Sequence, residues 1–308
     1  MSTRARWALA LTLVAALVGA GGCGIVSEGG ENVRLTVTRD FGAVDMVRAT
    51  QSSSPGGETV MRLLQRHAKV ETRYAGRFVN AIDGVRSSRA GGRRKDWFYY
   101  VNGIEADVGA ADRDLKAHDR VWWDYHDWGT AMRVPAVVGS FPEPFIHGAE
   151  GKRFPVRIDC AANASDTCER VSDRLDEAGI SPSTAALGAP AGKELLRFVV
   201  GKWSDIRSDG AVRQIEKGPA ESGVFARLYS SGKRVDLMSS AGTVAKSLTL
   251  GAGLVAATRF EEQQPTWIVS GTDQAGLDRA TELLTVKTLH DRFAVATDGS
   301  RAFALPMQ

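Results

Sequence analysis

Aromatic residues are concentrated in one short stretch of the chain, and this feature constrains the fold more than any other. Residues 97–128 hold four of the seven tryptophans. Successive side chains of a strand point to opposite faces of a sheet. A strand that begins at Trp97 therefore places Trp97 and Tyr99 on one face, and Phe98 and Tyr100 on the other. One buried face cannot hold all of these rings, so both faces of the sheet must carry aromatic side chains.

The same alternation recurs in the strand predicted at 120–125 and continues to the next residue, so that Trp123 and Tyr125 oppose Trp122 and His126. Two interpretations remain open. The second aromatic face packs against the rest of the chain, or it is partly exposed and stacks on a flat ligand or a partner. Under the second interpretation the predicted ligand-binding residues are Trp97, Tyr99, Asn102, Trp122, Trp123, Tyr125 and His126.

Patterns of strand and helix divide the chain into two parts. In the first part, alternation and helical periodicity predict strands at 33–37, 78–82, 97–101 and 120–125, and a helix at 59–68 capped by Thr59. Asn102-Gly103 is the strongest hairpin signal. In the second part we expect strands at 156–160, 195–200, 224–229, 235–238, 266–270 and 293–296, and helices at 167–178 and 274–286.

Four prolines between Arg133 and Pro155 indicate a linker or an extended packing segment, and the domain boundary is placed near it. Strands that alternate with helices after this point indicate an α/β layered arrangement. We therefore predict an α+β protein, with a small mixed-sheet domain over residues 33–130 and an α/β domain over residues 131–308.

The N-terminus has the pattern of an export signal. Arg4 and Arg6 precede an apolar run over residues 8–20, which is too short to span a bilayer, where about 20 residues are needed. Small residues then lead to Cys23, as in a bacterial lipobox. The sequence predicts a signal peptide over residues 1–22, lipidation of Cys23, and a tether over residues 23–32. Cleavage after Ala20, which would give a secreted protein, is the alternative.

Export determines how the other cysteines are interpreted. Cys160 and Cys168 are an even pair in an oxidising compartment, so a disulfide is predicted. No metal site is expected, because no further cysteine or histidine lies near them. Without Arg4 and Arg6 the chain carries 37 basic and 36 acidic residues, which argues against nucleic acid as a partner. Known catalytic motifs are missing, so no catalytic residues and no enzyme activity are predicted.

A family resemblance covers residues 33–128. It is carried by Gly57-Glu58-Thr59-Val60 before Leu63-Leu64, by Ile82-Asp83-Gly84, by the run from Trp97 to Gly103, and by Leu115, Asp119, Val121, Trp123 and Tyr125. This pattern resembles a bacterial domain-of-unknown-function family that is similar to the C-terminal β-domain of transcobalamin and intrinsic factor. The resemblance implies a β-grasp-like fold and a domain that covers one face of a corrinoid ring. The helical barrel that partners this domain in transcobalamin has no counterpart in the sequence.

Together these features predict a lipoprotein on the outer face of the cell membrane, which binds a corrinoid or another small ligand and passes it to an uptake transporter. In the corrinoid interpretation, the His126 imidazole approaches the cobalt. No cofactor other than such a ligand is expected. The rival hypothesis is a non-catalytic module that binds an envelope protein or a glycan. Separately, the basic loop over residues 86–95 is either solvated or a contact for anionic headgroups or a phosphate-bearing ligand.

Overall fold

The computed structural model describes residues 31–53, 56–74, 76–260 and 263–308. The predicted signal peptide, Cys23 and most of the predicted tether lie outside the described residues. Within the described ranges, no helix is long and apolar enough to cross a membrane.

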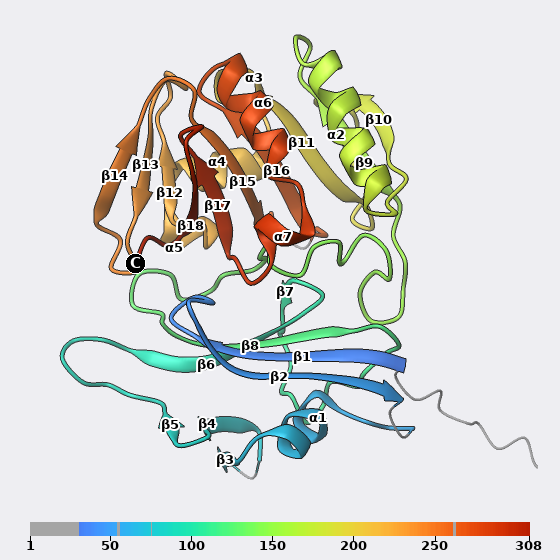
Figure 1. The fold of residues 1–308 in the computed structure, drawn as a ribbon, viewed down its shortest axis with the longest axis vertical. Coiled ribbons are helices and arrows are strands. Elements are labelled where there is room, and N and C mark those ends of the chain that lie inside the picture. Colours follow the sequence, from blue (N-terminus) through green and yellow to red (C-terminus); the bar gives the residue numbers. More distant parts are fainter. Residues whose placement is uncertain (1–30, 54–55, 75, 261–262) are drawn as a thin grey trace, which may run out of the picture.

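A five-stranded mixed sheet forms the centre of the N-terminal part (Figure 1). Its order is β2-β1-β8-β6-β7, with bounds β1 Glu31–Arg39, β2 Val44–Ser53, β6 Lys95–Val101, β7 Ile104–Glu105 and β8 Arg120–Asp127. β1 runs antiparallel to β2 and parallel to β8, and β8 runs antiparallel to β6. The hairpin predicted at Asn102-Gly103 joins β6 to β7, and both residues have the positive φ angles of such a turn, 55° and 78°.

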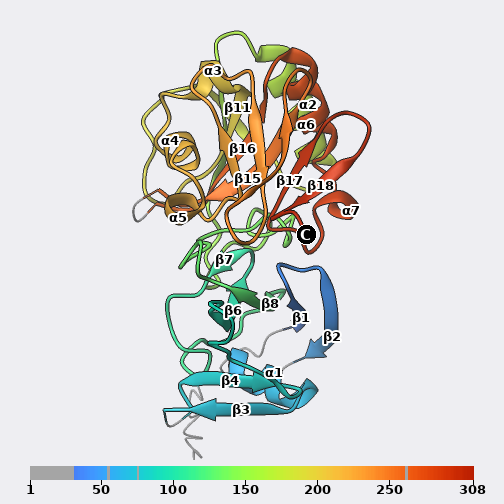
Figure 2. The same ribbon diagram turned by 90° about the vertical axis from the view of Figure 1, so that its left-hand side faces the viewer.

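One face of this sheet is covered by a lower layer, which lies at the bottom of Figures 1 and 2. It consists of a helix and a small antiparallel sheet: α1 Val60–His67, β3 Val70–Arg73, β4 Phe78–Ile82 and β5 Val85–Arg86. The helix is capped as predicted, because the Thr59 hydroxyl accepts a hydrogen bond from the Arg62 N–H at 3.3 Å. Leu63 and Leu64 are buried in one cluster with Leu35 of β1.

The C-terminal part contains a seven-stranded sheet in the order β10-β9-β11-β16-β15-β17-β18. The bounds are β9 Val156–Cys160, β10 Ser183–Ala186, β11 Leu196–Lys202, β15 Gly253–Thr258, β16 Thr266–Gly271, β17 Ala294–Thr297 and β18 Ala302–Leu305. The strands β10, β9, β11 and β16 are parallel to one another, and the others extend the sheet in antiparallel pairs. The apolar runs of β11, β15, β16 and β17 are buried on both faces, as expected for central strands between two layers.

Figure 2 shows helices on both sides of this sheet. On one side lie α2 Ser165–Glu177 and α6 Gln274–Glu282, which contact each other. On the other side lie α3 Trp203–Ile206, α4 Gly210–Glu216 and α5 Pro219–Ser222. The remaining elements are the short α7 Val286–Leu289 and a small antiparallel sheet of β12 Ala226–Leu228, β13 Val235–Met238 and β14 Val244–Leu248.

The upper face of the five-stranded sheet, which is turned toward the C-terminal part, packs directly against it. Phe293 has ring contacts of 5.1 Å with Trp122, 5.6 Å with Tyr100 and 5.5 Å with His126. The proline-containing segment 133–155 is largely buried between the two sheets, so it is a packing segment rather than a free linker. The predicted boundary near residue 130 stays a prediction, since one hydrophobic cluster includes residues from both sides of it.

The predicted α+β class is confirmed. The strands at 156–160 and 235–238 begin and end where the sequence places them. The helix predicted at 274–286 is wrong at its end, because α6 stops at Glu282 and α7 begins separately. The reason is a second cap: the Thr285 hydroxyl accepts a hydrogen bond from the Thr288 N–H at 3.1 Å and starts a new helix. The strands β2, β3, β5, β10, β14 and β18 were not predicted.

Candidate functional site

The predicted site residues on the lower face of the sheet form a buried aromatic layer. Tyr99 stacks on Trp123 with ring centroids 4.8 Å apart, and Trp97 lies 5.2 Å from Tyr125. Three of the four donate hydrogen bonds to backbone carbonyls. The Trp97 indole donates to the Val85 carbonyl at 2.9 Å, and the Tyr99 and Tyr125 hydroxyls each donate to a backbone carbonyl at 2.6 Å. Burial raises the pKa of the Tyr99 hydroxyl, so it stays a neutral donor.

On the upper face, His126 is held in a sandwich. Its ring stacks between Phe41 and Phe98, each with a centroid distance of 4.5 Å. Its Nδ1 lies 2.9 Å from an Asp124 carboxylate oxygen, and Asp124 also accepts hydrogen bonds from the Phe41 and Gly42 N–H groups. Only 2% of His126 is exposed. This environment fixes the ring as part of the packing between the two sheets.

Trp122 and Asn102 also have structural partners. Trp122 donates from Nε1 to the Thr38 hydroxyl at 2.8 Å and contacts Phe293. Asn102 donates to Asp119 at 2.9 Å and to the Gly148 carbonyl at 2.8 Å, which ties the β6–β7 turn to its neighbours. The aromatic residues of the predicted set are divided between the two faces of the sheet, and all seven predicted residues are buried in the structure. Ligand binding by them stays a prediction.

A groove lies where the β6–β7 hairpin meets the C-terminal part. A cavity of about 420 Å³ is lined by the segment 104–108 together with Arg113, Lys152, Phe154, Glu194 and Arg259. A second cavity, of about 590 Å³, shares Asp107 and Arg259 with the first. A third, of about 240 Å³, shares Glu105, Ala106 and Val108 with the first. We call these three adjoining cavities the junction groove.

The third cavity brings part of the predicted aromatic set to the junction groove. Trp97, Tyr99 and Trp123 all line it, alongside Phe78 of β4. Apolar side chains are also exposed nearby, since Val108 is 47% exposed and Met132, which lines the second cavity, is 68% exposed. The groove therefore combines aromatic edges with apolar groups that water can reach.

Charges of both signs line the junction groove. Glu105 is buried and accepts a hydrogen bond from Arg133 Nε at 3.0 Å. Burial raises the pKa of the Glu105 carboxyl, and the nearby Arg133 acts in the opposite direction. Arg113 pairs with Glu150 at 2.9 Å. Among the described residues, Asp107 has no hydrogen-bond or ion-pair partner, and Arg259 has no carboxylate partner.

Most residues of this groove carry no recognisable signal in the sequence. Asp107 and Arg259 are far apart in the chain, and neither belongs to a motif. The predicted parts are the hairpin turn that carries the segment 104–108 and the rings of Trp97, Tyr99 and Trp123, which line the third cavity. No group of histidine, cysteine, aspartate or glutamate residues that could hold a metal ion is found within the described ranges.

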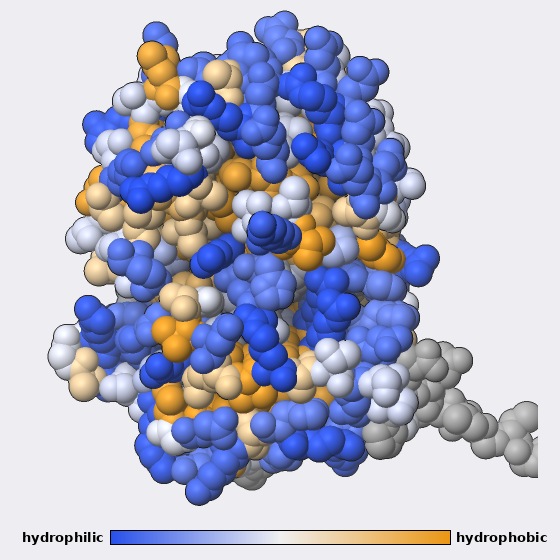
Figure 3. Space-filling view, viewed as in Figure 1, coloured by the Kyte–Doolittle hydropathy of each residue, from blue (hydrophilic) through white to orange (hydrophobic). Residues whose placement is uncertain are grey.

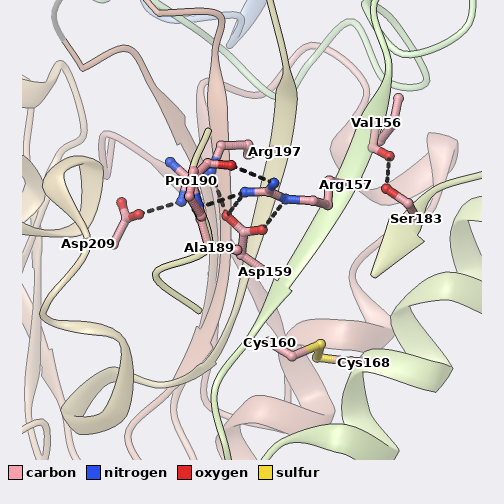
Figure 4. Close-up of polar contacts among 10 residues, drawn as sticks. All are labelled: Val156, Arg157, Asp159, Cys160, Cys168, Ser183, Ala189, Pro190, Arg197 and Asp209. Atoms are coloured by element: carbon pink, nitrogen blue, oxygen red, sulfur yellow. Dashed lines mark hydrogen bonds and ion pairs between the residues drawn. A yellow bond between two sulfur atoms is a disulfide. The ribbon is translucent and has the colours of Figure 1, made fainter. Parts of the chain in front are cut away.

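The predicted disulfide is confirmed, and Figure 4 shows it in the C-terminal part. It joins Cys160, at the end of β9, to Cys168 in α2. Beside it on β9, the buried Asp159 accepts hydrogen bonds from Arg157 at 2.5 Å and from Arg197 at 2.6 Å. Because every member of this network has a partner within the fold, we interpret it as structural.

Comparison with known proteins gives a family match to one segment. Residues 57–127 match the model of a domain of unknown function, DUF4430, and this confirms the resemblance to such a family for that segment. Two solved structures are similar to parts of the chain at low levels. One is a protein from Ruminococcus gnavus ATCC 29149, described as a candidate metal-binding protein: identity is 11%, coverage is 32% of this chain and 97% of that chain, and the TM-score is 0.25.

The other solved structure is haptocorrin in complex with Cbi, with 13% identity and a TM-score of 0.26. That match covers 36% of this chain and 28% of haptocorrin, so the chain spans less than a third of haptocorrin's length. No curated protein matches the chain.

Proposed function

We propose that this protein is an envelope ligand-binding protein that takes a small molecule into the junction groove. The observation that carries the proposal is the adjoining set of cavities, which places exposed apolar groups, and charges that lack a charged partner among the described residues, beside aromatic rings. Small-molecule sites are typically concave, about 300–1,000 Å³ in volume, and apolar with a few polar groups that fix orientation. The two larger cavities fall within this range.

Asp107 and Arg259 are the residues that we expect to orient the ligand. They line both larger cavities from opposite parts of the fold, and neither carboxylate nor guanidinium has a charged partner among the described residues. Charged groups with unused hydrogen-bonding capacity gain more from a polar ligand than groups already paired. A ligand with an apolar body and a polar rim matches both the apolar and the charged residues that line the junction groove.

Corrinoids are the ligand class to examine first. The sequence resemblance of the N-terminal part supports this choice, and a broad ring with amide groups at its edge has the mixed character of the groove. Anchoring through Cys23 and transfer to an uptake transporter complete the proposal, and both rest on the N-terminal sequence. The proposal includes no catalytic step.

The test is a titration of the chain from Gly24 onward with cobalamin and with cobinamide, followed by tryptophan fluorescence and calorimetry. Saturable binding at about micromolar affinity or tighter is expected. Arg259→Gln should weaken it roughly tenfold or more, the worth of one charge-assisted hydrogen bond. Arg227→Gln is the matched control, because Arg227 is exposed and lines none of the three cavities.

Each negative outcome removes a different part of the proposal. No heat and no quenching with either corrinoid would exclude this ligand class. Binding that Arg259→Gln leaves unchanged would place the ligand outside the junction groove. The exposed Met132 favours the second candidate, a module that binds an envelope protein or glycan. That candidate would be favoured if no ligand bound, and if an envelope partner purified with the unaltered protein but not with a variant in which Met132 is replaced.

A further inference from the structure

Positive charge is concentrated in the lower layer of the molecule. Residues 60–95 contain ten lysines and arginines but only two acidic residues, Glu71 and Asp83. The whole chain, by contrast, has 39 basic and 36 acidic residues. A local excess of this size in a nearly neutral chain produces a directed field over one part of the surface.

The fold places most of this charge on the end of the molecule that is farthest from the seven-stranded sheet (Figures 1 and 2). Figure 3 shows this lower edge covered by hydrophilic residues. We define the basic face as six exposed cations on and beside α1, β3, β4 and β5: Arg62, Arg66, Lys69, Arg73, Arg77 and Arg86.

Only part of the basic face is neutralised within the fold. Arg66 pairs with Glu58, and Arg86 pairs with Glu71, each at 2.5 Å. The other four cations have no carboxylate partner among the residues that the structure describes. These four remain available to an anionic partner.

An aromatic residue stands at the tip of the same face. Tyr74 follows β3 and is 77% exposed, with its ring edge-on to Phe78 at 6.4 Å. Tyrosine is enriched where proteins meet the boundary between membrane and water, because its ring is apolar and its hydroxyl is polar. An exposed tyrosine between Arg73 and Arg77 is therefore better suited to the membrane–water boundary than to bulk water.

We propose that the basic face docks on an anionic phospholipid bilayer. Its cations are spread over a helix, a hairpin and a turn, and only Arg77 lines one of the cavities described above. Such an arrangement fits a flat partner with many mobile negative charges rather than a single compact anion. The proposal does not depend on the junction groove or on its ligand.

The test is co-sedimentation of the chain from Gly24 onward, which carries no lipid, with two kinds of vesicle. The described fold begins at Glu31, so this chain retains all of it. Vesicles that contain 30% phosphatidylglycerol in phosphatidylcholine should bind the protein, and pure phosphatidylcholine vesicles should not. Binding should weaken steeply between low and high salt, because exposed charges are screened.

A fourfold variant tests the face itself: Arg62→Gln, Lys69→Gln, Arg73→Gln and Arg77→Gln. Each cation near an anionic surface contributes about fivefold to partitioning, so the loss of four cations should weaken binding roughly 600-fold. The control variant loses the same number of positive charges in the C-terminal part: Lys217→Gln, Arg227→Gln, Lys233→Gln and Lys287→Gln. These four cations are also exposed and also lack a carboxylate partner among the described residues.

Three results would overturn the proposal. The first is absence of binding to anionic vesicles at low salt, which would leave an acidic protein as the partner of this face. The second is equal binding to both vesicle types. The third is that the two fourfold variants weaken vesicle binding equally, which would mean that binding depends on the net charge of the protein and not on the basic face. If the first variant fails to fold, the lipid and salt dependence of the unaltered protein still decides between these outcomes.

Discussion

Replacing Phe293 by alanine tests whether the two sheets form one cooperative structure. Phe293 precedes β17 and is 3% exposed. Besides Trp122, Tyr100 and His126, its ring contacts Phe41 at 5.0 Å, so four aromatic partners belong to the N-terminal part. Removing this ring would open a cavity between the two sheets rather than within either of them.

The expected loss follows from the contacts. A buried phenylalanine replaced by alanine costs about 3–5 kcal/mol of unfolding free energy, depending on how far the site collapses. Edge-to-face ring pairs add about 0.5–1.5 kcal/mol each beyond area burial. With four such pairs, Phe293→Ala should lie in the upper half of the range, at roughly 4–5 kcal/mol.

Phe303→Ala is the matched control. Phe303 is 5% exposed in β18, and its ring is covered by Lys246 at 4.3 Å and Arg301 at 4.6 Å. It has no ring contact with the five-stranded sheet among the described residues, so its replacement should cost about 3 kcal/mol and act locally.

The assay is urea unfolding followed by circular dichroism, together with hydrogen exchange of the β8 amides. Phe293→Ala should speed exchange in β8, although β8 is far away in sequence, and Phe303→Ala should not. A loss below about 1 kcal/mol for Phe293→Ala, or unchanged exchange in β8, would refute the idea of a shared core.

Two further predictions concern the disulfide and a buried carboxyl. Replacing Cys160 and Cys168 by alanine should lower the unfolding free energy by about 2.5 kcal/mol, from loop-closure entropy alone, and the same loss in reduced unaltered protein would confirm the cause. Because burial raises the pKa of Glu105 in the folded protein, its contribution to stability is present at low pH and is lost as pH rises through the folded pKa. In urea unfolding, the Glu105→Gln variant should therefore have the same unfolding free energy as the unaltered protein near pH 4, and a larger one near pH 8. A variant that is less stable than the unaltered protein at pH 8 would mean that the ion pair between Glu105 and Arg133 outweighs the cost of burying the carboxylate.

The N-terminal fold was largely predictable because its signals are local. Thr59 caps α1 through a hydrogen bond to a residue three positions away, and Asn102-Gly103 forms its turn from its own φ angles. The disulfide follows from cysteine count and compartment. In contrast, β2 was missed because it is an edge strand whose exposed and half-buried positions give weak alternation.

The candidate site was less predictable, for a physical reason. Strand alternation correctly indicated that both faces of the sheet carry aromatic residues. It could not decide what covers the second face, because that depends on Phe225 and Phe293, which lie far along the chain. The junction groove depends in the same way on Arg259 meeting the segment 104–108.

The contact between Phe293 and the upper face also sets an order of events during synthesis. A chain made from its N-terminus completes β8 about 170 residues before Phe293. At roughly 5–20 residues per second, this leaves an interval of about 10–30 s in which the rings of Trp122 and Phe41 lack their contacts with Phe293. For that interval we expect holding chaperones to bind the nascent N-terminal sheet, and slowing translation after residue 130 should increase its aggregation.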